Sequence, residues 1–396
     1  MIGSPGFIGE RLEQARKVRG LTAVALAEML EVKSATNITQ YEHGKQSPSP
    51  EVLEKMVARL NRPRDFFFKA VSQFDHEGIC YRSMSSATKT ARMRAEVRLL
   101  WLKELVSYLR KYMDFPKLNI PAFSLPGEVD QISLSDAEDV ANECRRFYGL
   151  GDGPLPDVVL LLENNGVIVT RGEMGAETLD ALSQSPRDDA QPYVFLGTDK
   201  SSAVRSRFDA AHELGHLLLH CHIDRDAATR NTRAYSLMEQ QCHRFASAFL
   251  LPETGFGREL WAPTLNSFLT LKPRWKTSIA AMMKRSEELG ILEERNVRRS
   301  WINLSRRGWR KEEPLDGTLK HEQPRLLRRS VELLVDSGIK TKDQILADLS
   351  FNASDIESLA CLPDTFFKSA PAEAVPVLKE QPAGSTVIPF RARPRG

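Results

Sequence analysis

The chain has 396 residues, more than one small hydrophobic core accommodates, so we expect two or more domains. Hydrophobic residues make up 41% and charged residues 27% of it, which is ordinary for a water-soluble globular protein. No apolar run reaches the roughly 20 residues of a membrane span, so we expect no membrane association. The net charge of +3 neither requires nor excludes a nucleic-acid partner, so local clusters of charge decide that question.

The cysteines and the first residues indicate a reducing compartment. The five cysteines are scattered, odd in number and without a CxxC spacing, which argues against a disulfide framework. The start, MIGSPGFIGERLEQ, lacks the basic and apolar segments of an export signal. We therefore expect a cytoplasmic protein.

Residues 1–70 have the pattern of short helices with tight connections. Their apolar skeleton comprises Leu12, Leu21, Leu26, Ala27, Leu30, Val32, Ile38, Leu53 and Leu60. Thr22 is suited to N-cap the second helix. The segment resembles the XRE-type helix-turn-helix of the lambda-repressor group, although Glu31 stands where a turn glycine is common in that group.

The resemblance implies binding to double-stranded DNA, with a recognition helix at about Ala35 to Tyr41 in the major groove. Thr36, Asn37 and Gln40 have side chains able to read base edges. The cations expected at phosphates are Arg16, Lys17, Arg19, Lys33 and Lys45. Such modules usually bind as dimers, so we expect a homodimer. The alternative is a helix-turn-helix kept only for dimerisation or for a protein partner.

The middle of the chain contains a long helix and a boundary. Residues 82–112 place apolar side chains at helical spacing with Arg and Lys between them, and a Pro-broken connector follows. We assign residues 71–130 to a basic helical linker. Its cations either extend a DNA-binding surface or, as is more common, form the solvated face of a helix.

Residues 131–310 combine helices with a small sheet. VVLLLENNGVIVTRG indicates the end of a helix, an Asn-Gly turn and a strand, QPYVFLGT indicates a second strand, and residues 201–251 are helical. We expect a helical extension over residues 311–368 and a flexible Pro-rich tail over residues 369–396. The predicted fold class is α+β, mostly α.

The segment FDAAHELGHLLLHCH contains an HExxH motif. His212 and His216 lie one turn apart on one helical face, where two imidazoles reach a single Zn²⁺. Glu213 is rotated away from them, in the position of a general base for a metal-held water. The alternative is a buried helix whose histidines are hydrogen-bonded within the core.

A catalytic zinc needs a third protein ligand and one open position. SLMEQQCHRFASAFLLP offers Glu239, Cys242 and His243 on one helix, and we favour Glu239, with His243 as an orienting residue or alternative ligand. His220 either points near the site or caps its helix. Gly215 is small enough to let a second segment approach the metal.

These segments resemble the ImmA/IrrE family of zinc-dependent metallopeptidases. The resemblance implies a zincin-like domain, Zn²⁺ as cofactor, and a third ligand at Glu239. Where that family usually has Asn or Asp, this chain has His243. Understood members cleave a repressor, often under stress, and long fused members are usually called transcriptional regulators.

Three hypotheses follow. In the first, a DNA-binding regulator uses Glu213 and zinc to cleave a partner repressor or antitoxin, with His220, Tyr235 or a backbone amide stabilising the oxyanion. In the second, the peptidase-like domain of a transcription factor or antitoxin is a metal or ligand sensor that cleaves nothing. A protease switched on by DNA is a third option.

Overall fold

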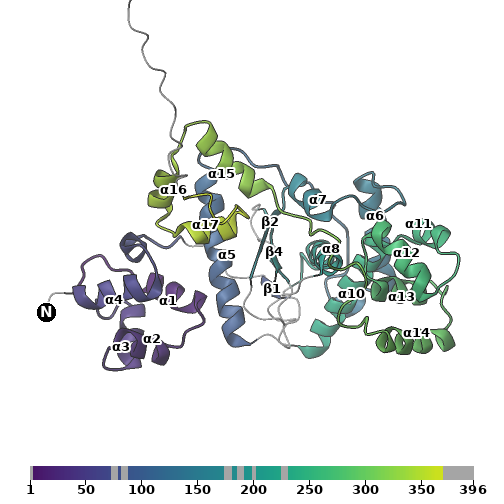
Figure 1. Cartoon of the computed structure of the whole chain (residues 1–396), viewed down its shortest axis with the longest axis horizontal. Coiled ribbons are helices and arrows are strands. Elements are labelled where there is room, and N and C mark those ends of the chain that lie inside the picture. The colour runs from purple at the N-terminus through teal and green to yellow at the C-terminus, as the bar shows by residue number, and fades with distance from the viewer. Residues whose placement is uncertain are drawn as a thin grey trace, which may run out of the picture.

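The computed structural model describes residues 3–72, 79–81, 88–173, 181–184, 191–198, 202–223 and 231–368. Within these ranges the protein is mostly helical with one small sheet, so the predicted fold class is confirmed (Figure 1). None of the helices in the described part is long and apolar enough to cross a membrane. The predicted tail, residues 369–396, lies outside the described residues, and the domain boundaries stay predictions.

The N-terminal domain is a compact set of short helices. They are α1 (Gly9–Val18), α2 (Ala23–Leu30), α3 (Ala35–Glu42), α4 (Pro50–Leu60) and the 3-10 helix η1 (Arg64–Phe68). The side chains that close its core are fully buried: Leu12, Leu26, Leu30, Ile38, Leu53 and Leu60. The Thr22 side chain accepts a hydrogen bond from the amide of Ala25 at 3.1 Å, as predicted for an N-cap.

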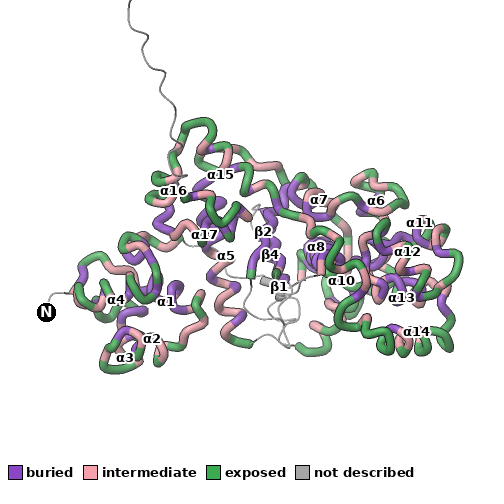
Figure 2. The backbone as a smooth tube through the Cα atoms, in the orientation of Figure 1, coloured by how far each residue is buried: buried purple, intermediate pink, exposed green. Residues whose placement is uncertain are grey.

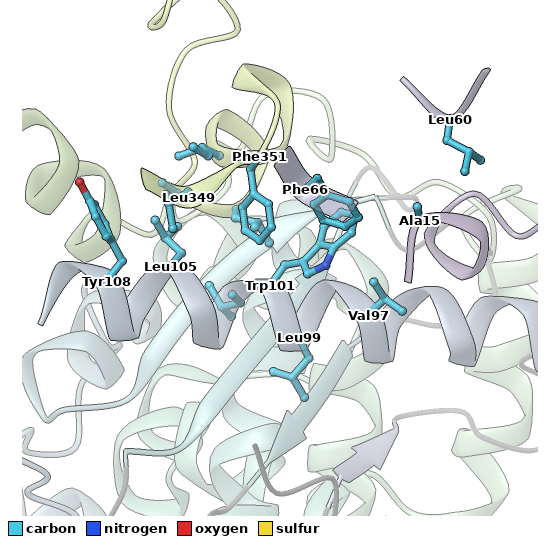
Figure 3. Close-up of a cluster of buried hydrophobic side chains, with 14 of the residues drawn as sticks. Ala15, Leu60, Phe66, Val97, Leu99, Trp101, Leu105, Tyr108, Leu349 and Phe351 are labelled. Atoms are coloured by element: carbon cyan, nitrogen blue, oxygen red, sulfur yellow. The ribbon is translucent and has the colours of Figure 1, made fainter. Parts of the chain in front are cut away.

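The helix predicted after this domain is α5 (Lys89–Leu109), and it is a packing element in place of a solvated basic linker. The Trp101 ring lies 5.8 Å from that of Phe66 and 5.3 Å from that of Phe351, so both ends of the chain meet on α5 (Figure 3). Arg11 of α1 makes a buried ion pair with Glu104 of α5 at 2.8 Å. The helix therefore joins the N-terminal domain to the rest of the molecule.

The sheet lies between two hydrophobic cores. Its strands β1 (Ile79–Tyr81), β2 (Ile168–Gly172), β3 (Ala181–Gln184) and β4 (Tyr193–Gly197) are ordered β1-β3-β4-β2, with β2 parallel to β4 and the other pairs antiparallel. Alternate side chains enter opposite cores, because successive residues of a strand point to opposite faces. Ile168 and Phe195 pack in the core that contains α5, whereas Val169 and Val194 pack in the core that contains α8 (Ala203–Leu219).

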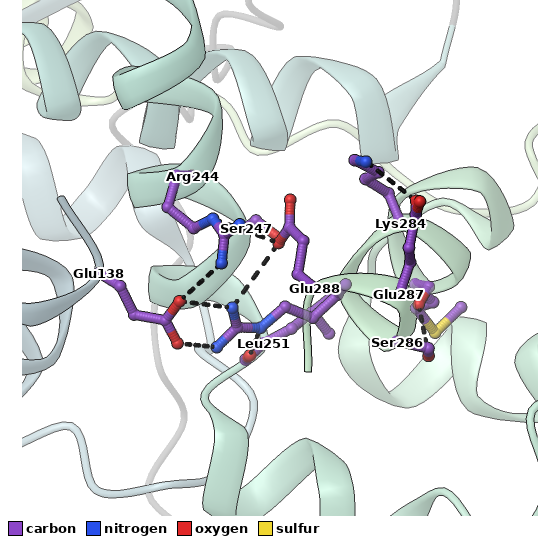
Figure 4. Close-up of polar contacts among 10 residues, drawn as sticks. Glu138, Arg244, Ser247, Leu251, Lys284, Ser286, Glu287 and Glu288 are labelled. Atoms are coloured by element: carbon purple, nitrogen blue, oxygen red, sulfur yellow. Dashed lines mark hydrogen bonds and ion pairs between the residues drawn. The ribbon is translucent and has the colours of Figure 1, made fainter. Parts of the chain in front are cut away.

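A group of helices lies on this side of the sheet and carries the candidate site, and among them α8 contacts β3 and β4 and α7 (Val158–Asn164) contacts β2. The group comprises α6 (Leu134–Phe147), α7, α8, α10 (Thr232–Leu250), α11 (Glu253–Glu259), α12 (Leu265–Trp275), α13 (Ile279–Glu288) and α14 (Glu294–Arg306). Glu138 of α6 pairs with Arg285 of α13 at 2.7 Å and with Arg244 of α10 at 3.0 Å (Figure 4). These ion pairs fix α10 between its neighbours.

The predicted C-terminal extension is helical and returns to α5. It comprises α15 (Leu326–Asp336), α16 (Lys342–Leu349) and α17 (Ala353–Leu359). Arg62 of the N-terminal domain forms an ion pair with Asp355 of α17, and its guanidinium lies 4.4 Å above the Trp101 ring. In Figure 2 the sheet and α8, which carries the site, are drawn as buried, as are stretches of α5 and α17.

Candidate metal centre and helix-turn-helix surface

The two histidines of the HExxH motif lie together on the buried face of α8. The rings of His212 and His216 are 4.8 Å apart, and the two side chains are 0% and 2% exposed. Glu213, between them in sequence, is also fully buried. A helix that buries two imidazoles and a carboxylate needs polar partners for them, because unpaired polar groups are costly inside a protein.

The closest neighbour of α8 is α10, and Gly215 permits the approach. A Cβ atom at Gly215 would lie 3.0 Å from Cδ1 of Phe245 and 3.4 Å from Cα of Cys242. A side chain here would press on the Phe245 ring, which would have to shift by a few tenths of an ångström. The glycine therefore has the role that its place inside the motif suggested, and α10 reaches the histidines.

Glu239 of α10 presents its carboxylate to both histidines. Its oxygens lie 3.3 Å from Nε2 of His216 and 3.6 Å from Nε2 of His212. Both distances exceed an ordinary charge-assisted hydrogen bond of about 2.7–2.9 Å. Ligands at about 2.0–2.1 Å from a tetrahedral ion lie about 3.3 Å from one another, so the spacing fits donors that share one zinc.

The charge state of Glu239 also suits a metal ligand. Burial by itself raises the pKa of Glu239, but the close approach of His212 and His216 outweighs it and holds the pKa well below its usual range. The carboxyl group is therefore ionised at neutral pH, which is the form that binds a metal. Two imidazoles and one carboxylate are the donor set of a catalytic zinc with one position left for water.

Cys242 and His243 remain alternative donors. The ligand atoms of His212, His216 and Cys242 lie within 4.8 Å of one another, as do those of His212, Glu239 and His243. Cys242 is fully buried, and its Sγ lies 3.6 Å from Nδ1 of His220, where a thiol is a weak donor. We retain Glu239 because it approaches both histidines of the motif.

His243 lies on the outer side of the cluster. Its Nδ1 is 2.6 Å from the carbonyl oxygen of Glu239, so Nδ1 carries the proton and Nε2 the lone pair. Its ring is exposed and lies 4.7 Å from the ring of His212 in an edge-to-face arrangement. This bond fixes one turn of α10 beside the candidate metal site.

Tyr235, one turn before Glu239 on α10, is half-buried.

His220 lies next to His216 and ends a chain of directed hydrogen bonds. The Gln241 side-chain amide donates to the carbonyls of Val129 and Ile132 at 2.8 and 2.7 Å, so its oxygen must accept. That oxygen lies 2.8 Å from Nε2 of His220, which therefore carries the proton. Nδ1 of His220 then accepts from Nδ1 of His216 at 3.2 Å. The lone pair of His216 is thereby placed on Nε2, toward Glu239.

Sequence patterns gave no indication of Gln241, and the structure makes its role testable. Replacing Gln241 by Met keeps the side-chain length and removes the bonds that orient His220 and His216. We expect zinc affinity to fall about 10- to 100-fold, as for other residues that orient metal ligands. Competition with a chelating dye measures the affinity, with Gln240→Met as the exposed neighbouring control. Unchanged affinity in a folded Gln241→Met protein would contradict this role.

The helix-turn-helix surface is formed by α2 and α3. The turn after α2 passes through Glu31 with φ +56°, the left-handed conformation that glycine provides in the related modules. Thr36 is exposed and Gln40, one turn later on α3, is half-buried, so both side chains are accessible at the surface of α3. Asn37 is half-buried, and its side-chain oxygen accepts a hydrogen bond from Ser34 at 2.9 Å.

The predicted phosphate contacts are only partly available. Lys33 and Lys45 are exposed, and Lys17 is half-buried and paired with Glu13 at 2.8 Å. The prediction for Arg16 was wrong. Its guanidinium is buried in a two-pronged ion pair with Glu42 at 2.5 and 3.0 Å and also donates to the carbonyl of Leu21. Arg16 therefore joins α1 to the end of α3 and does not face DNA.

Comparison with known families agrees with these two sites. Residues 12–67 match the family model described as Helix-turn-helix, and residues 162–287 match the model described as IrrE N-terminal-like domain, an M78 peptidase family. No curated protein matches the chain. The chain thus combines an XRE-type helix-turn-helix domain with an IrrE/ImmA-like peptidase domain. The second match contains His212, His216, Glu239 and His243.

Proposed function

We propose that the protein is a cytoplasmic, homodimeric regulator that binds double-stranded DNA and hydrolyses a peptide bond in a protein partner, such as a repressor or antitoxin. The observation that carries the proposal is the position of the Glu239 carboxylate, which approaches Nε2 of both His212 and His216 at a spacing suited to one zinc ion. The family match supports the same chemistry.

The residues of the site have separate roles in this proposal. Zinc, when bound, supplies a Lewis acid and lowers the pKa of a water molecule. His212, His216 and Glu239 hold the ion, and the bonds from His220 and His243 keep His216 and α10 in place. Glu213 is the buried carboxylate next to His212, and it takes the proton of the attacking water and passes it to the leaving amine. Tyr235 is our candidate for stabilising the oxyanion.

Cleavage is tested with the full chain and proteins encoded beside it. Each candidate partner is incubated with zinc-loaded protein and with protein stripped by a chelator, and fragments are identified by mass spectrometry. We expect one defined cleavage that requires zinc and returns when zinc is restored. A protein that binds zinc and DNA and regulates transcription without cleaving any partner would be the non-cleaving sensor.

The DNA-binding half predicts different effects for Gln40, which is half-buried, and Lys45, which is exposed. On a site selected from random DNA, Gln40→Ala should reduce the binding free energy by about 1–3 kcal/mol, because Gln40 reads a base edge. It should also relax the sequence preference at one base pair. Lys45→Ala should weaken binding to all DNA sequences alike, because Lys45 meets a phosphate. It should also lower the number of ions released on binding, read from the salt dependence, by about one. Lys320→Ala, an exposed cation outside this domain, is the control. Binding isotherms at several salt concentrations that show no such difference would contradict the assignment.

A further inference from the structure

A large cavity lies one helical turn along α8 from the candidate metal site. It has a volume of about 820 Å³ and is bounded by the first turns of α8, the start of α13, α14 and residues 309–317. Phe208 lines it, one turn before His212 on α8, and the Phe208 ring lies 5.9 Å from that of His243. A chain bound across the metal candidate would therefore reach this cavity.

The cavity is suited to an apolar group. Its lining includes the side chains of Phe208, Trp301, Leu304 and Trp309. Both tryptophans are half-buried, and the guanidinium groups of Arg307 and Arg310 lie over their rings, 4.8 Å from the centroid of Trp309 and 5.9 Å from that of Trp301. Cavities of about 300–1,000 Å³ with aromatic walls are typical of ligand sites, and this one has room for more than one side chain.

The wall formed by residues 309–317 is fixed in place. The fully buried Lys272 pairs with Glu313 at 2.8 Å and with Asp316 at 2.7 Å. Glu313 also accepts hydrogen bonds from the amides of Ile279 and Ala280, at the start of α13. These two acidic residues are therefore neutralised within the wall and contribute little negative charge to the cavity.

The rim of the cavity has a net positive charge. Three exposed cations line it, against one exposed acidic residue, Glu312. Arg310 and Lys311 line the cavity directly, as does the exposed Arg205 of α8. A cluster of one sign attracts a partner of the opposite sign and raises its rate of association.

We infer that this cavity binds a segment of the protein substrate in which an apolar or aromatic side chain is flanked by aspartate or glutamate. The inference rests on the proposed peptidase function. The apolar depth receives the side chain, and the basic rim meets the flanking carboxylates. Single-stranded nucleic acid also combines flat rings with negative charge. A peptide is favoured because the cavity adjoins the groups that would cleave one.

Binding is measured on the zinc-loaded Glu213→Gln protein by fluorescence anisotropy. The probes are a labelled peptide of alternating glutamates around a central Phe-Leu pair, the same peptide with lysines for glutamates, and a short oligothymidine. We expect the acidic peptide to bind and the basic one not to bind. Trp309→Ala should lower the affinity for the acidic peptide about tenfold, as the loss of an aromatic anchor does at other interfaces. Trp261→Ala, which removes a tryptophan that is 96% exposed on another surface, should have no effect.

The charge contribution is tested separately at exposed positions, where folding is not at risk. Reversal at Arg310 and Lys311 to glutamate should remove the preference for the acidic peptide, whereas Arg329→Glu on α15 should not. Equal binding of both peptides, or no effect of the tryptophan and charge changes, would overturn the inference. Tighter binding of oligothymidine at the same residues would assign the cavity to nucleic acid. Binding is measured on Glu213→Gln and so does not depend on cleavage. Binding of the acidic peptide, together with no cleavage of any partner by the native protein, would reject the peptidase function and leave this site standing.

Discussion

Replacing Glu213 by Gln is expected to lower the rate of partner cleavage by about a thousandfold and to leave zinc binding and DNA binding unchanged. The reason is that the glutamine has the size of the native side chain but cannot accept a proton, and a positioned general base contributes about 10²–10⁴-fold. Glu213 lies between His212 and His216 but belongs to neither cluster of candidate metal ligands among the described residues.

The measurement compares single-turnover cleavage of the identified partner by native and variant protein, with zinc content determined on the same samples. Asp209→Asn, one turn earlier on the buried face of α8, is a control for the loss of a carboxylate from that helix. Loss of zinc from Glu213→Gln would show that Glu213 serves the metal itself. Unchanged regulation in cells that carry Glu213→Gln would favour the non-cleaving sensor.

Replacing Glu239 by Ala is expected to reduce bound zinc from one ion per chain to far below one at micromolar metal. Two imidazoles alone leave the ion without the ionised ligand that α10 supplies, and the remaining pair holds it weakly. Elemental analysis of the purified chain gives the stoichiometry, with Glu253→Ala, an exposed carboxylate on α11, as the control. Retained zinc in Glu239→Ala would transfer the third position to Cys242 or His243.

The local part of the site was predictable because its geometry is set by one helix. The four-residue spacing of His212 and His216 predicts a shared face, and the structure places both rings on the buried side of α8. The proximity of Glu239 depends on how α10 crosses α8. Gly215 suggested a close approach, but the segment that makes it was identified only by the pattern EQQCH and by family resemblance.

Features that depend on distant contacts were not predictable. Gln241 acts through the carbonyls of Val129 and Ile132, more than a hundred residues earlier in the chain. Arg16 was assigned to DNA as one of the cations of the helix-turn-helix module, and its partner Glu42 becomes apparent only when α1 packs against α3. Local charge patterns do not indicate whether a cation is exposed.

The same limit applies to the fold. The period of apolar residues predicts the α5 helix, but the same pattern is compatible with a solvated linker. Its burial arises because Phe66 and Phe351, from opposite ends of the chain, both pack on Trp101. Strands β1 and β3 are short and carry little alternation, and sequence patterns did not predict them.

The most direct test of the metal centre is an anomalous diffraction map of the full chain, recorded on both sides of the zinc edge. The proposal predicts one peak within about 2.0–2.2 Å of Nε2 of His212, Nε2 of His216 and a carboxylate oxygen of Glu239, with a non-protein ligand in the fourth position. A peak bound to Cys242 at about 2.3 Å with four protein ligands, or no peak between α8 and α10 in zinc-grown crystals, would contradict it.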